Sequence, residues 1–304
     1  MLKSQAGRKL FIIANPASGG GRPFRKICDC IRGKKVSGLE IEFLPTKAPG
    51  HAGVLARELL NRPCDLLAVC GGDGTINEIV SALPSPPPFP LAVLPGGTAN
   101  VLAREIGLPL SPASALDVAL KGKIRRVDIG EMKARQNRRF TFVAGVGFDA
   151  WAAHRACSTK ARLTFKAKAG IAAYAVAVAE SLALYKFPEF TIAVDGGSYT
   201  ATSCLVCNAR SYGGNLTFCP DADMTDGLLD VMIVAGARRA TLAGFMLSAW
   251  FRPGTTPSWI RRIRTRELYM DGPSTVRVET DGELAGELPA GFSLLEKSLP
   301  LIVP

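Results

Sequence analysis

Up to residue 105, short hydrophobic runs alternate with segments whose polar and apolar positions follow helical spacing. Each run ends in a proline, glycine or asparagine, which is typical of a strand that leads into a turn. We expect strands at residues 9–14, 39–44, 66–70 and 91–94, and helices at residues 24–32, 51–61, 75–82 and 101–105. Strands that alternate with helices predict an α/β fold with an open, mostly parallel sheet and flanking helices.

The pattern changes near residue 127, beyond which hydrophobic positions alternate over short stretches bounded by Gly or Asp-Gly turns. Such stretches predict a second, β-rich domain. Its strands are expected at residues 127–132, 139–143, 189–194, 199–206, 228–234 and 275–279, with helices near 165–184 and 238–251. The sequence therefore predicts an α/β domain over residues 1–127 and a β-rich domain over residues 128–291. Whether residues 292–304 return to the first domain is left open.

Three glycine-rich turns follow strands of the first domain, at Asn15–Gly21, Gly71–Asn77 and Pro95–Asn100. Because glycine has no Cβ atom, backbone N–H groups in such turns can close on a polyanion. The helix that follows each turn directs its positive end to the same place. Ligands of open α/β sheets bind beyond the carboxyl ends of the strands, where all three turns fall. The set predicts a phosphate-binding site.

The second turn carries a carboxylate, Asp73, between Gly72 and Gly74. A carboxylate among phosphate-binding glycines repels phosphate unless it binds a cation or takes up a proton. Mg²⁺ prefers hard oxygen ligands and keeps several waters, so we expect Asp73 to hold the Mg²⁺ of a nucleotide through water. The alternative role is a charge partner for the N-terminus of the next helix. The combination points to Mg²⁺-dependent phosphoryl transfer from a nucleotide.

The amino-acid composition and net charge indicate which class of binding partner to expect. Hydrophobic residues make up 47% of the 304 residues, and 37 Lys and Arg against 26 Asp and Glu give a net charge of +11. A positive excess favours an anionic partner such as a nucleotide or an acidic membrane surface, although solubility alone is the simple alternative. No helix-turn-helix, zinc finger or aromatic RNA-binding platform is evident, so no nucleic-acid partner is expected.

The cysteines and apolar stretches favour a cytoplasmic protein. Cys204 and Cys207 have the spacing of half a zinc site, but no second pair accompanies them. Their apolar surroundings favour buried thiols in a reducing cytosol. The apolar stretch at residues 171–184 is shorter than the roughly 20 residues that span a bilayer. Any contact with a membrane is therefore expected to be peripheral.

Taken together, the motifs resemble the diacylglycerol kinase catalytic-domain family, which includes bacterial lipid kinases and sphingosine kinases. The motifs are the three glycine turns, Thr46 with Gly50-His51-Ala52, and the stretches at residues 223–230 (DMTDGLLD) and 281–283 (DGE). They cover nearly the full chain in the order of that family. Val101 stands where many members have an acid, which puts in doubt a metal or lysine contact there and not the fold.

The resemblance implies a nucleotide-binding α/β domain, a second domain that is β-sandwich-like, and an active site in the cleft between them. It also implies ATP as donor, Mg²⁺ as cofactor and a lipid hydroxyl as acceptor. The residues expected to bind the nucleotide are Asn15, Ser18, Thr46, Gly71, Gly72, Asp73, Gly74, Thr75, Ile76, Asn77 and Thr98. For each threonine taken alone, a helix N-cap is an equal alternative.

Two acidic segments of the second domain carry further expected roles. The resemblance implies that Glu283 is the base that takes the hydroxyl proton, whereas its spacing after an Asp-Gly pair alone indicates a hairpin turn. Asp223, Asp226 and the Leu228 carbonyl look like a second, structural Mg²⁺ site, and Asp226 is expected also to orient the attacking group. The alternative for this loop is an Asx-type turn with solvated acids.

Basic residues beside apolar ones suit an anionic lipid surface. They occur within residues 160–184 and at residues 261–266, directly after Trp259 and Ile260. Core helix packing explains the first segment equally well, and a solvated basic loop explains the second. We expect peripheral contact with the anionic inner face of a membrane.

The leading hypothesis is an ATP-dependent kinase of a lipid alcohol, with diacylglycerol as first candidate and a sphingoid base, ceramide or phosphatidylglycerol as others. A NAD kinase shares the central Gly-Asp-Gly turn but does not explain the first and third turns together. A non-catalytic nucleotide- or lipid-binding regulator is a third hypothesis, against which the intact set Asp73, Asp226 and Glu283 argues. The acceptor and the assembly, for which a homodimer is one option, stay open.

Overall fold

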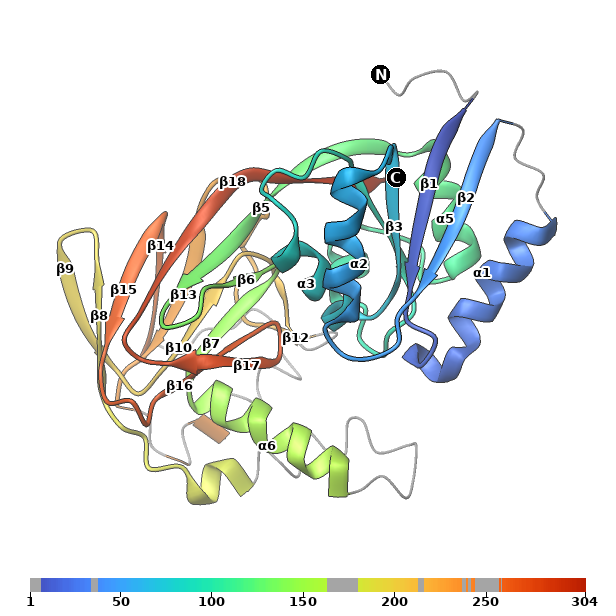
Figure 1. Cartoon of the computed structure of the whole chain (residues 1–304). Helices are drawn as coiled ribbons and strands as arrows, with labels where there is room; N and C mark the ends of the chain where they lie inside the picture. Colours follow the sequence, from blue (N-terminus) through green and yellow to red (C-terminus); the bar gives the residue numbers. More distant parts are fainter. Residues whose placement is uncertain are drawn as a thin grey trace. The chain divides into compact units, whose positions relative to one another are not determined.

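The structure, a computed structural model, describes residues 7–33, 38–162, 180–212, 216–236, 239, 242–243, 257 and 259–304. They form two compact units, which are described separately below (Figure 1). The first unit comprises residues within Met1–Ile129 and Leu295–Pro304, and the second comprises residues within Gly130–Leu294. The chain thus leaves the first unit after residue 129 and returns to it at residue 295.

A parallel sheet forms the centre of the first unit. Its strands are β1 (Arg8–Ala14), β2 (Leu39–Pro45), β3 (Leu66–Gly71), β4 (Leu91–Pro95) and the end of β18 (Ala290–Val303). They lie in the order β2-β1-β3-β4-β18, and each neighbouring pair is parallel. The first four strands therefore end at the same edge of the sheet, where the turns that follow them lie side by side.

Helices cover both faces of this sheet. They are α1 (Arg22–Gly33), α2 (His51–Glu58), α3 (Asp73–Ala82), α4 (Val101–Glu105) and α5 (Pro112–Lys121), with 3-10 turns at Ser18–Gly21 and Leu59–Asn61. Helices α1 and α5 pack on one face, where Ile27 and Leu116 join Ile12 and Ala68 in one core. Helices α2 and α3 lie together over the other face (Figure 1). This unit has three layers, as the alternation of elements predicts.

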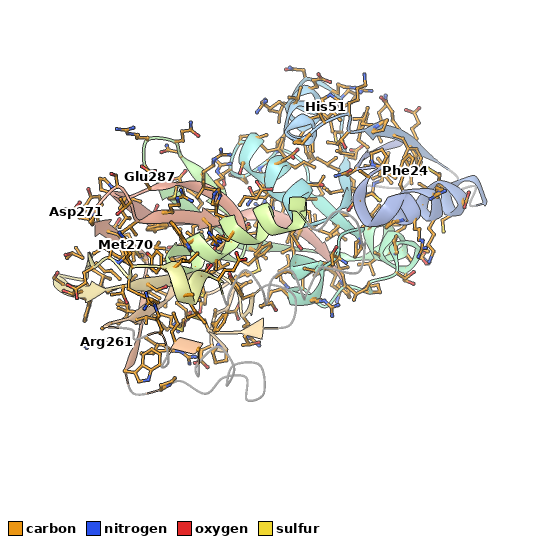
Figure 2. The ribbon with its side chains drawn as sticks, turned by 90° about the horizontal axis from the view of Figure 1, so that it is seen from below. Phe24, His51, Arg261, Met270, Asp271 and Glu287 are labelled. Carbon is orange, nitrogen blue, oxygen red and sulfur yellow. The ribbon has the colours of Figure 1, made fainter. Side chains whose placement is uncertain are left out.

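The inner strands β1, β3 and β4 are buried on both faces, which explains their near-continuous hydrophobic sequences, whereas the outer strand β2 is partly exposed. Ile12, Ile13 and Leu67 are completely buried, although neighbouring residues of a strand point to opposite faces. At the margin of the unit, Phe24 of α1 meets Phe43 of β2 edge-on, with 6.2 Å between the ring centroids (Figure 2). The aromatic contact closes α1 over the strand at the sheet edge.

The second unit is built mainly of antiparallel strands. Its elements are the end of β5 (Lys123–Lys133), β6 (Arg138–Phe140), β7 (Val143–Gly147), α6 (Phe148–Arg162), β8 (Phe190–Val194), β9 (Gly197–Ala201), β10 (Ser203–Cys207), β11 (Ser211–Tyr212), β12 (Leu216–Thr217), β13 (Leu229–Val234), β14 (Ile260–Thr265), β15 (Glu267–Asp271), β16 (Arg277–Thr280), β17 (Glu283–Glu287) and the start of β18. One sheet has the order β14-β13-β10-β7-β16-β17. The other contains the run β18-β15-β8-β9, to which β5 and β6 are joined.

Side chains from the two sheets form one core in the second unit. Val146 and Val278 of the first sheet share it with Ile192 and Phe292 of the second. Two antiparallel sheets that bury their facing sides against each other form a sandwich-like layer pair. The fold class expected from the sequence, α/β followed by a β-rich sandwich-like part, is confirmed.

Several elements differ from the sequence prediction. The single strand expected at residues 199–206 is two strands, β9 and β10, separated by Thr202, whose N–H donates to the Val234 carbonyl (2.9 Å). The basic segment after Trp259 is the strand β14, which pairs with β13, so it is not a solvated loop. The sequence pattern did not indicate α5 and α6. The helices expected near 165–184 and 238–251 lie largely outside the described residues.

Two expectations concerned thiols and membrane spans. Cys204 and Cys207 are buried in β10, and burial raises the pKa of the Cys204 thiol well above its ordinary value, as expected for an inert core thiol. Within the ranges that the structure describes, no helix has both the length and the apolar character needed to cross a bilayer.

Candidate functional site

The three glycine turns meet at the carboxyl edge of the first unit's sheet. The Gly96 N–H donates to the Gly71 carbonyl (2.8 Å), and the Ser18 hydroxyl donates to the Gly96 carbonyl (2.7 Å). A Cβ atom on Gly97 would lie 2.5 Å from the Cα atom of Gly72, so only glycine fits at this contact. The three turns are therefore held against one another largely by their backbones.

Asn15 links the first turn to the second. Its N–H donates to the Cys70 carbonyl at the end of β3 (2.9 Å), and its Nδ2 donates to the Thr75 hydroxyl (3.4 Å). Its Oδ1 accepts the Ala17 N–H (3.0 Å), which shapes the turn itself. The bond between Asn15 and Thr75 thus holds the first two turns together, whether or not these residues also bind a ligand.

Asn100 shapes the third turn and was not among the predicted binding residues. Its φ of 49° lies in the left-handed region, which asparagine tolerates better than most residues. Its Oδ1 accepts the Gly97 N–H (2.8 Å), and its Nδ2 donates to the Gly97 carbonyl (2.9 Å). Thr98 lies on the exposed side of the same turn. The side chain of Asn100 therefore fixes the turn in the conformation that brings Gly97 against Gly72.

Asp73 lies where two helices begin. It is in the first turn of α3, and its Oδ1 accepts the Leu102 N–H (3.2 Å) in the first turn of α4. Burial raises the pKa of Asp73, and bonds from backbone N–H groups, including that of Val101, oppose the rise. Val101 thus contributes its N–H to this carboxylate while its side chain is buried.

The surroundings of Asp73 fit a hydrated cation. The carboxylate is only half-buried and lies among glycine turns that suit phosphates. An ionised carboxylate has about four acceptor positions, and backbone N–H groups of residues 73 and 100–102 act on this one, so a Mg²⁺-bound water would take the place of one of them. The role of helix charge partner is visible in these contacts, and the metal contact stays a prediction.

Thr46 directly follows β2, and its N–H donates to the Ala14 carbonyl (2.8 Å). The loop that follows is fixed from α3, because the Glu78 carboxylate accepts the N–H groups of Gly50 (2.8 Å) and Ala52 (3.1 Å). Glu78 was not predicted, since an acid within one helix gives no signal that it caps another. It ties the threonine loop to the helix that carries Asp73.

The other predicted nucleotide-binding residues lie in the first two turns of α3. The Ile76 side chain is buried, and its N–H donates to the Gly72 carbonyl (3.2 Å) as part of the helix. Asn77 is half-buried and its Oδ1 accepts the Ser81 hydroxyl (3.1 Å), while Gly74 is partly exposed. Ile76 therefore acts through packing, whereas Gly74 and Asn77 keep partial access to solvent.

In the second unit, Glu283 follows a two-residue turn between β16 and β17. The two central residues have positive φ, 50° at Asp281 and 89° at Gly282, and Thr280 pairs with Glu283. This is the geometry of a type I′ hairpin. Glu283 is the exposed first residue of β17.

The Asp281 carboxylate anchors this turn. Its Oδ2 accepts the Thr141 N–H (2.7 Å) and hydroxyl (2.9 Å), and its Oδ1 accepts the N–H groups of Phe142 (3.0 Å) and Val143 (3.1 Å). Bonds to a charged acceptor are stronger than neutral ones. Glu283 therefore extends from a turn that is fixed on one side by four donors.

Two acids that the sequence did not single out lie beside the same turn. Glu279 of β16 is completely buried, and its carboxyl meets that of Asp149, at the start of α6, over the Cα atom of Gly145. The Tyr212 hydroxyl donates to Asp149 Oδ1 (2.5 Å), and the Gly282 N–H donates to Glu279 Oε2 (2.5 Å). The available signal was Gly145, because glycine inside an apolar strand marks a close approach.

The acidic loop at residues 223–230 is held partly by its own side chains. Asp223 Oδ1 accepts the N–H (2.9 Å) and hydroxyl (2.7 Å) of Thr225. Asp226 Oδ1 accepts the Leu228 N–H (3.0 Å). These contacts are Asx-type turns, which was the alternative to a metal loop.

Arg264 of β14 places a guanidinium beside this loop. It pairs with Asp226, and its Nε lies 3.3 Å from Asp230 Oδ2. Among the residues that the structure describes, no group of three or more His, Cys, Asp or Glu is arranged to hold a metal ion. Arg264 supplies positive charge next to Asp226 in this arrangement, and the second Mg²⁺ site stays a prediction.

Two family models match the chain. The model for the diacylglycerol kinase catalytic domain matches residues 9–132. The model for the YegS C-terminal NAD kinase beta sandwich-like domain matches residues 142–303. The two matches follow each other along the chain and together account for most of it.

Individual proteins resemble the chain over almost its whole length. A diacylglycerol kinase from Staphylococcus aureus (strain MRSA252) is 29% identical over 296 residues, which are 96% of this chain and 91% of that protein. The crystal structure of a diacylglycerol kinase from Bacillus anthracis str. Sterne has a TM-score of 0.73 and 22% identity, covering 99% of this chain and 98% of that one. An NAD kinase from Archaeoglobus fulgidus, solved in complex with ATP, has a TM-score of 0.51 and 15% identity, covering 96% and 92%. These structural similarities concern the fold.

Proposed function

Because the chain belongs to the diacylglycerol kinase catalytic-domain family, we propose that it transfers the γ-phosphate of ATP to the hydroxyl of a lipid alcohol. Diacylglycerol is the first candidate, and a sphingoid base, ceramide or phosphatidylglycerol fit the same residues. The observation that carries the proposal is the contact of three glycine turns around Asp73. It combines a backbone cradle for phosphates with a carboxylate suited to Mg²⁺.

The first unit would bind the nucleotide. The N–H groups at Gly72–Gly74 and the N-terminus of α3 would face the phosphates, and Asn15, Ser18 and Thr46 would complete the site. Asp73 would hold Mg²⁺ through water. When bound, Mg²⁺ neutralises charge on the phosphates. The residues of the first unit would hold ATP in a fixed position before the lipid alcohol binds.

The second unit would contribute the base. Glu283 is exposed and follows the anchored turn, so its carboxylate would take the proton of the attacking hydroxyl. A bond then forms between the hydroxyl oxygen and the γ-phosphorus, and the bond from that phosphorus to the bridging oxygen breaks to release ADP. The position of Glu283 would determine how well the lipid hydroxyl is oriented for attack on the γ-phosphorus.

The lipid acceptor requires contact with a bilayer surface, and β14 supports such contact. Arg261 is exposed on this strand, and its guanidinium lies over the Tyr199 ring, 4.7 Å from the centroid (Figure 2). An aromatic ring beside an arginine suits the interface of an anionic membrane. We include peripheral binding to the inner membrane face in the proposal.

The test is a transfer assay with purified protein, labelled ATP and Mg²⁺. Anionic vesicles with diacylglycerol, the same vesicles without it, and NAD are offered separately. We expect label only in the lipid. Label in NAD would favour the NAD kinase hypothesis, which the fold similarity to an NAD kinase supports. No label in any acceptor, with ATP still bound, would favour a non-catalytic regulator.

Matched variants sharpen the assay. Asp73→Asn and Glu283→Gln should each lower kcat by about 10²-fold or more, because one weakens the metal contact and the other removes the base. Asp271→Asn and Glu287→Gln change exposed carboxylates on β15 and β17 (Figure 2) and should leave kcat unchanged. If Glu283→Gln matched its control Glu287→Gln, Glu283 would have no part in the reaction.

A further inference from the structure

The carboxyls of Asp149 and Glu279 lie closer together than two carboxylate anions should. A Cβ atom on Gly145 would overlap Asp149 Oδ2 and lie 2.7 Å from Glu279 Oε1, so both oxygens occupy the space that this glycine leaves. Glu279 is completely buried. Two negative charges at this separation in a buried site repel strongly, which ordinarily leaves only one of them ionised.

The hydrogen bonds show where a single proton fits. Asp149 Oδ1 accepts the Tyr212 hydroxyl, and Glu279 Oε2 accepts the Gly282 N–H. The other two oxygens, Asp149 Oδ2 and Glu279 Oε1, are buried and have no donor from the rest of the described protein. One proton on Glu279 Oε1, donated to Asp149 Oδ2, satisfies both atoms. It leaves Glu279 Oε2 as the carbonyl-type oxygen that accepts from Gly282.

Burial and then the charge of Asp149 raise the pKa of Glu279 well above its ordinary value. Burial also raises the pKa of Asp149, while the bonds from Glu279 and Tyr212 oppose the rise. The directions agree with Glu279 as the protonated partner and Asp149 as the anion. The charge of Asp281 also favours a neutral Glu279.

We propose that Asp149 and Glu279 share one proton and that this acid pair helps to position the turn that carries Glu283. The pair holds the Gly282 N–H from one side, and the Asp281 carboxylate holds Thr141, Phe142 and Val143 from the other. Gly282 is the residue directly before Glu283, so the pair acts on the base through the backbone. Asp149 and Glu279 are thus positioning residues, and this role rests on the proposed function of Glu283.

Two substitutions at residue 279 separate the effect of the hydrogen bonds from the effect of the side-chain volume. In Glu279→Gln, the amide N–H₂ can donate to Asp149 Oδ2 and the amide oxygen can accept from Gly282, so both bonds survive. In Glu279→Leu, both bonds are lost. We expect kcat of Glu279→Gln to stay within about threefold of wild type and that of Glu279→Leu to fall about 10²-fold, with KM for ATP unchanged in both. Glu287→Leu, an exposed change on β17, is the control.

Two further measurements do not depend on kinase activity. Infrared spectra at neutral pH should show the C=O stretch of a protonated carboxyl in wild type and not in Glu279→Gln. Hydrogen exchange at the Gly282 amide should be slow in wild type and Glu279→Gln and at least about tenfold faster in Glu279→Leu. These readouts decide the proton sharing and the hold on the turn even if no lipid is phosphorylated, in which case the proposed function fails separately.

Three results would overturn the inference. They are a Glu279→Gln variant that loses as much kcat as Glu279→Leu, a wild-type spectrum without the protonated carboxyl band, and Gly282 exchange that is equal in all variants. The first would indicate that both acids are ionised and neutralised by another group. The isosteric glutamine keeps the test valid if the leucine variant fails to fold.

Discussion

Two acid-bearing glycine turns, one in each unit, are built by opposite means. The turn at Gly72–Gly74 is shaped by missing side chains, because Gly72 and Gly97 approach too closely for a Cβ atom. The turn at Asp281–Glu283 is shaped by present side chains, because the Asp281 carboxylate and Glu279 hold the surrounding N–H groups. Each contains an aspartate and a glycine, yet the aspartates have different tasks.

The difference shows which part of each turn is sensitive to change. Asp73 is half-buried and accepts backbone N–H groups at the starts of α3 and α4, and part of its surface stays accessible to solvent. Asp281 accepts four bonds within the second unit, so it is a structural acid beside the proposed base Glu283. Removing a side chain should therefore harm the second turn most, and adding one should harm the first.

The largest expected effect is that of Asp281→Ala on stability. The change leaves the N–H groups of Thr141, Phe142 and Val143 without their acceptor. We expect a loss of roughly 3–4 kcal/mol in the free energy of unfolding, measured by urea denaturation. Asp271→Ala, at an exposed position, should change it by about 0.5 kcal/mol or less. A loss below about 1 kcal/mol for Asp281→Ala would contradict the structural role.

Adding a methyl group to the first turn is the converse test. Gly97→Ala places a Cβ atom 2.5 Å from the Gly72 Cα, so the two turns must separate. We expect a loss of about 2 kcal/mol in stability together with weaker ATP binding in a titration. Gly197→Ala is the matched control, because its nearest neighbouring atom would be 3.5 Å away. Unchanged ATP affinity in Gly97→Ala would mean that contact of the turns is not needed for the nucleotide.

The last expected effect is a pH dependence of stability that arises in the second turn. Glu279 has a raised pKa in the folded protein, so above pH 4.5 the folded state keeps a proton that the unfolded chain loses. Stability from this group is complete below that pH and falls as the pH rises toward the folded pKa. Relative to Glu279→Gln, the wild type should lose about 1.4 kcal/mol per pH unit in this window. Parallel stability curves in urea denaturation would contradict a protonated Glu279.

Hydrophobic periodicity predicted the fold class correctly in the segments where the apolar positions follow one clear period. Val101–Glu105 was predicted with its observed bounds, because an asparagine turn marks its start. Residues 199–206 were merged into one strand, since alternation continues through Thr202 while the chain changes sheets there. Sheet changes depend on tertiary pairing, here the bond from Thr202 to Val234, which local sequence does not encode.

The candidate site was predictable to the extent that it lies in contiguous motifs. The glycine turns and the Asp-Gly-Glu hairpin could be found, because their residues are neighbours in sequence. Glu78, Asp149 and Tyr212 could not, because each acts on a residue far along the chain. The proposed contact between Asp149 and Glu279 also depends on a shared proton, which an amino-acid sequence does not indicate.

The pairing of Leu301 in β18 with Leu91 in β4 has a consequence for biosynthesis. On the ribosome, the last strand of the N-terminal sheet emerges only after all of residues 130–294 have been translated. Until then β4 offers an open hydrogen-bonding edge, which is a route to aggregation for a nascent chain. Premature termination between residues 106 and 294 should therefore leave the sheet of the first unit without β18, even though all three glycine turns have already been translated.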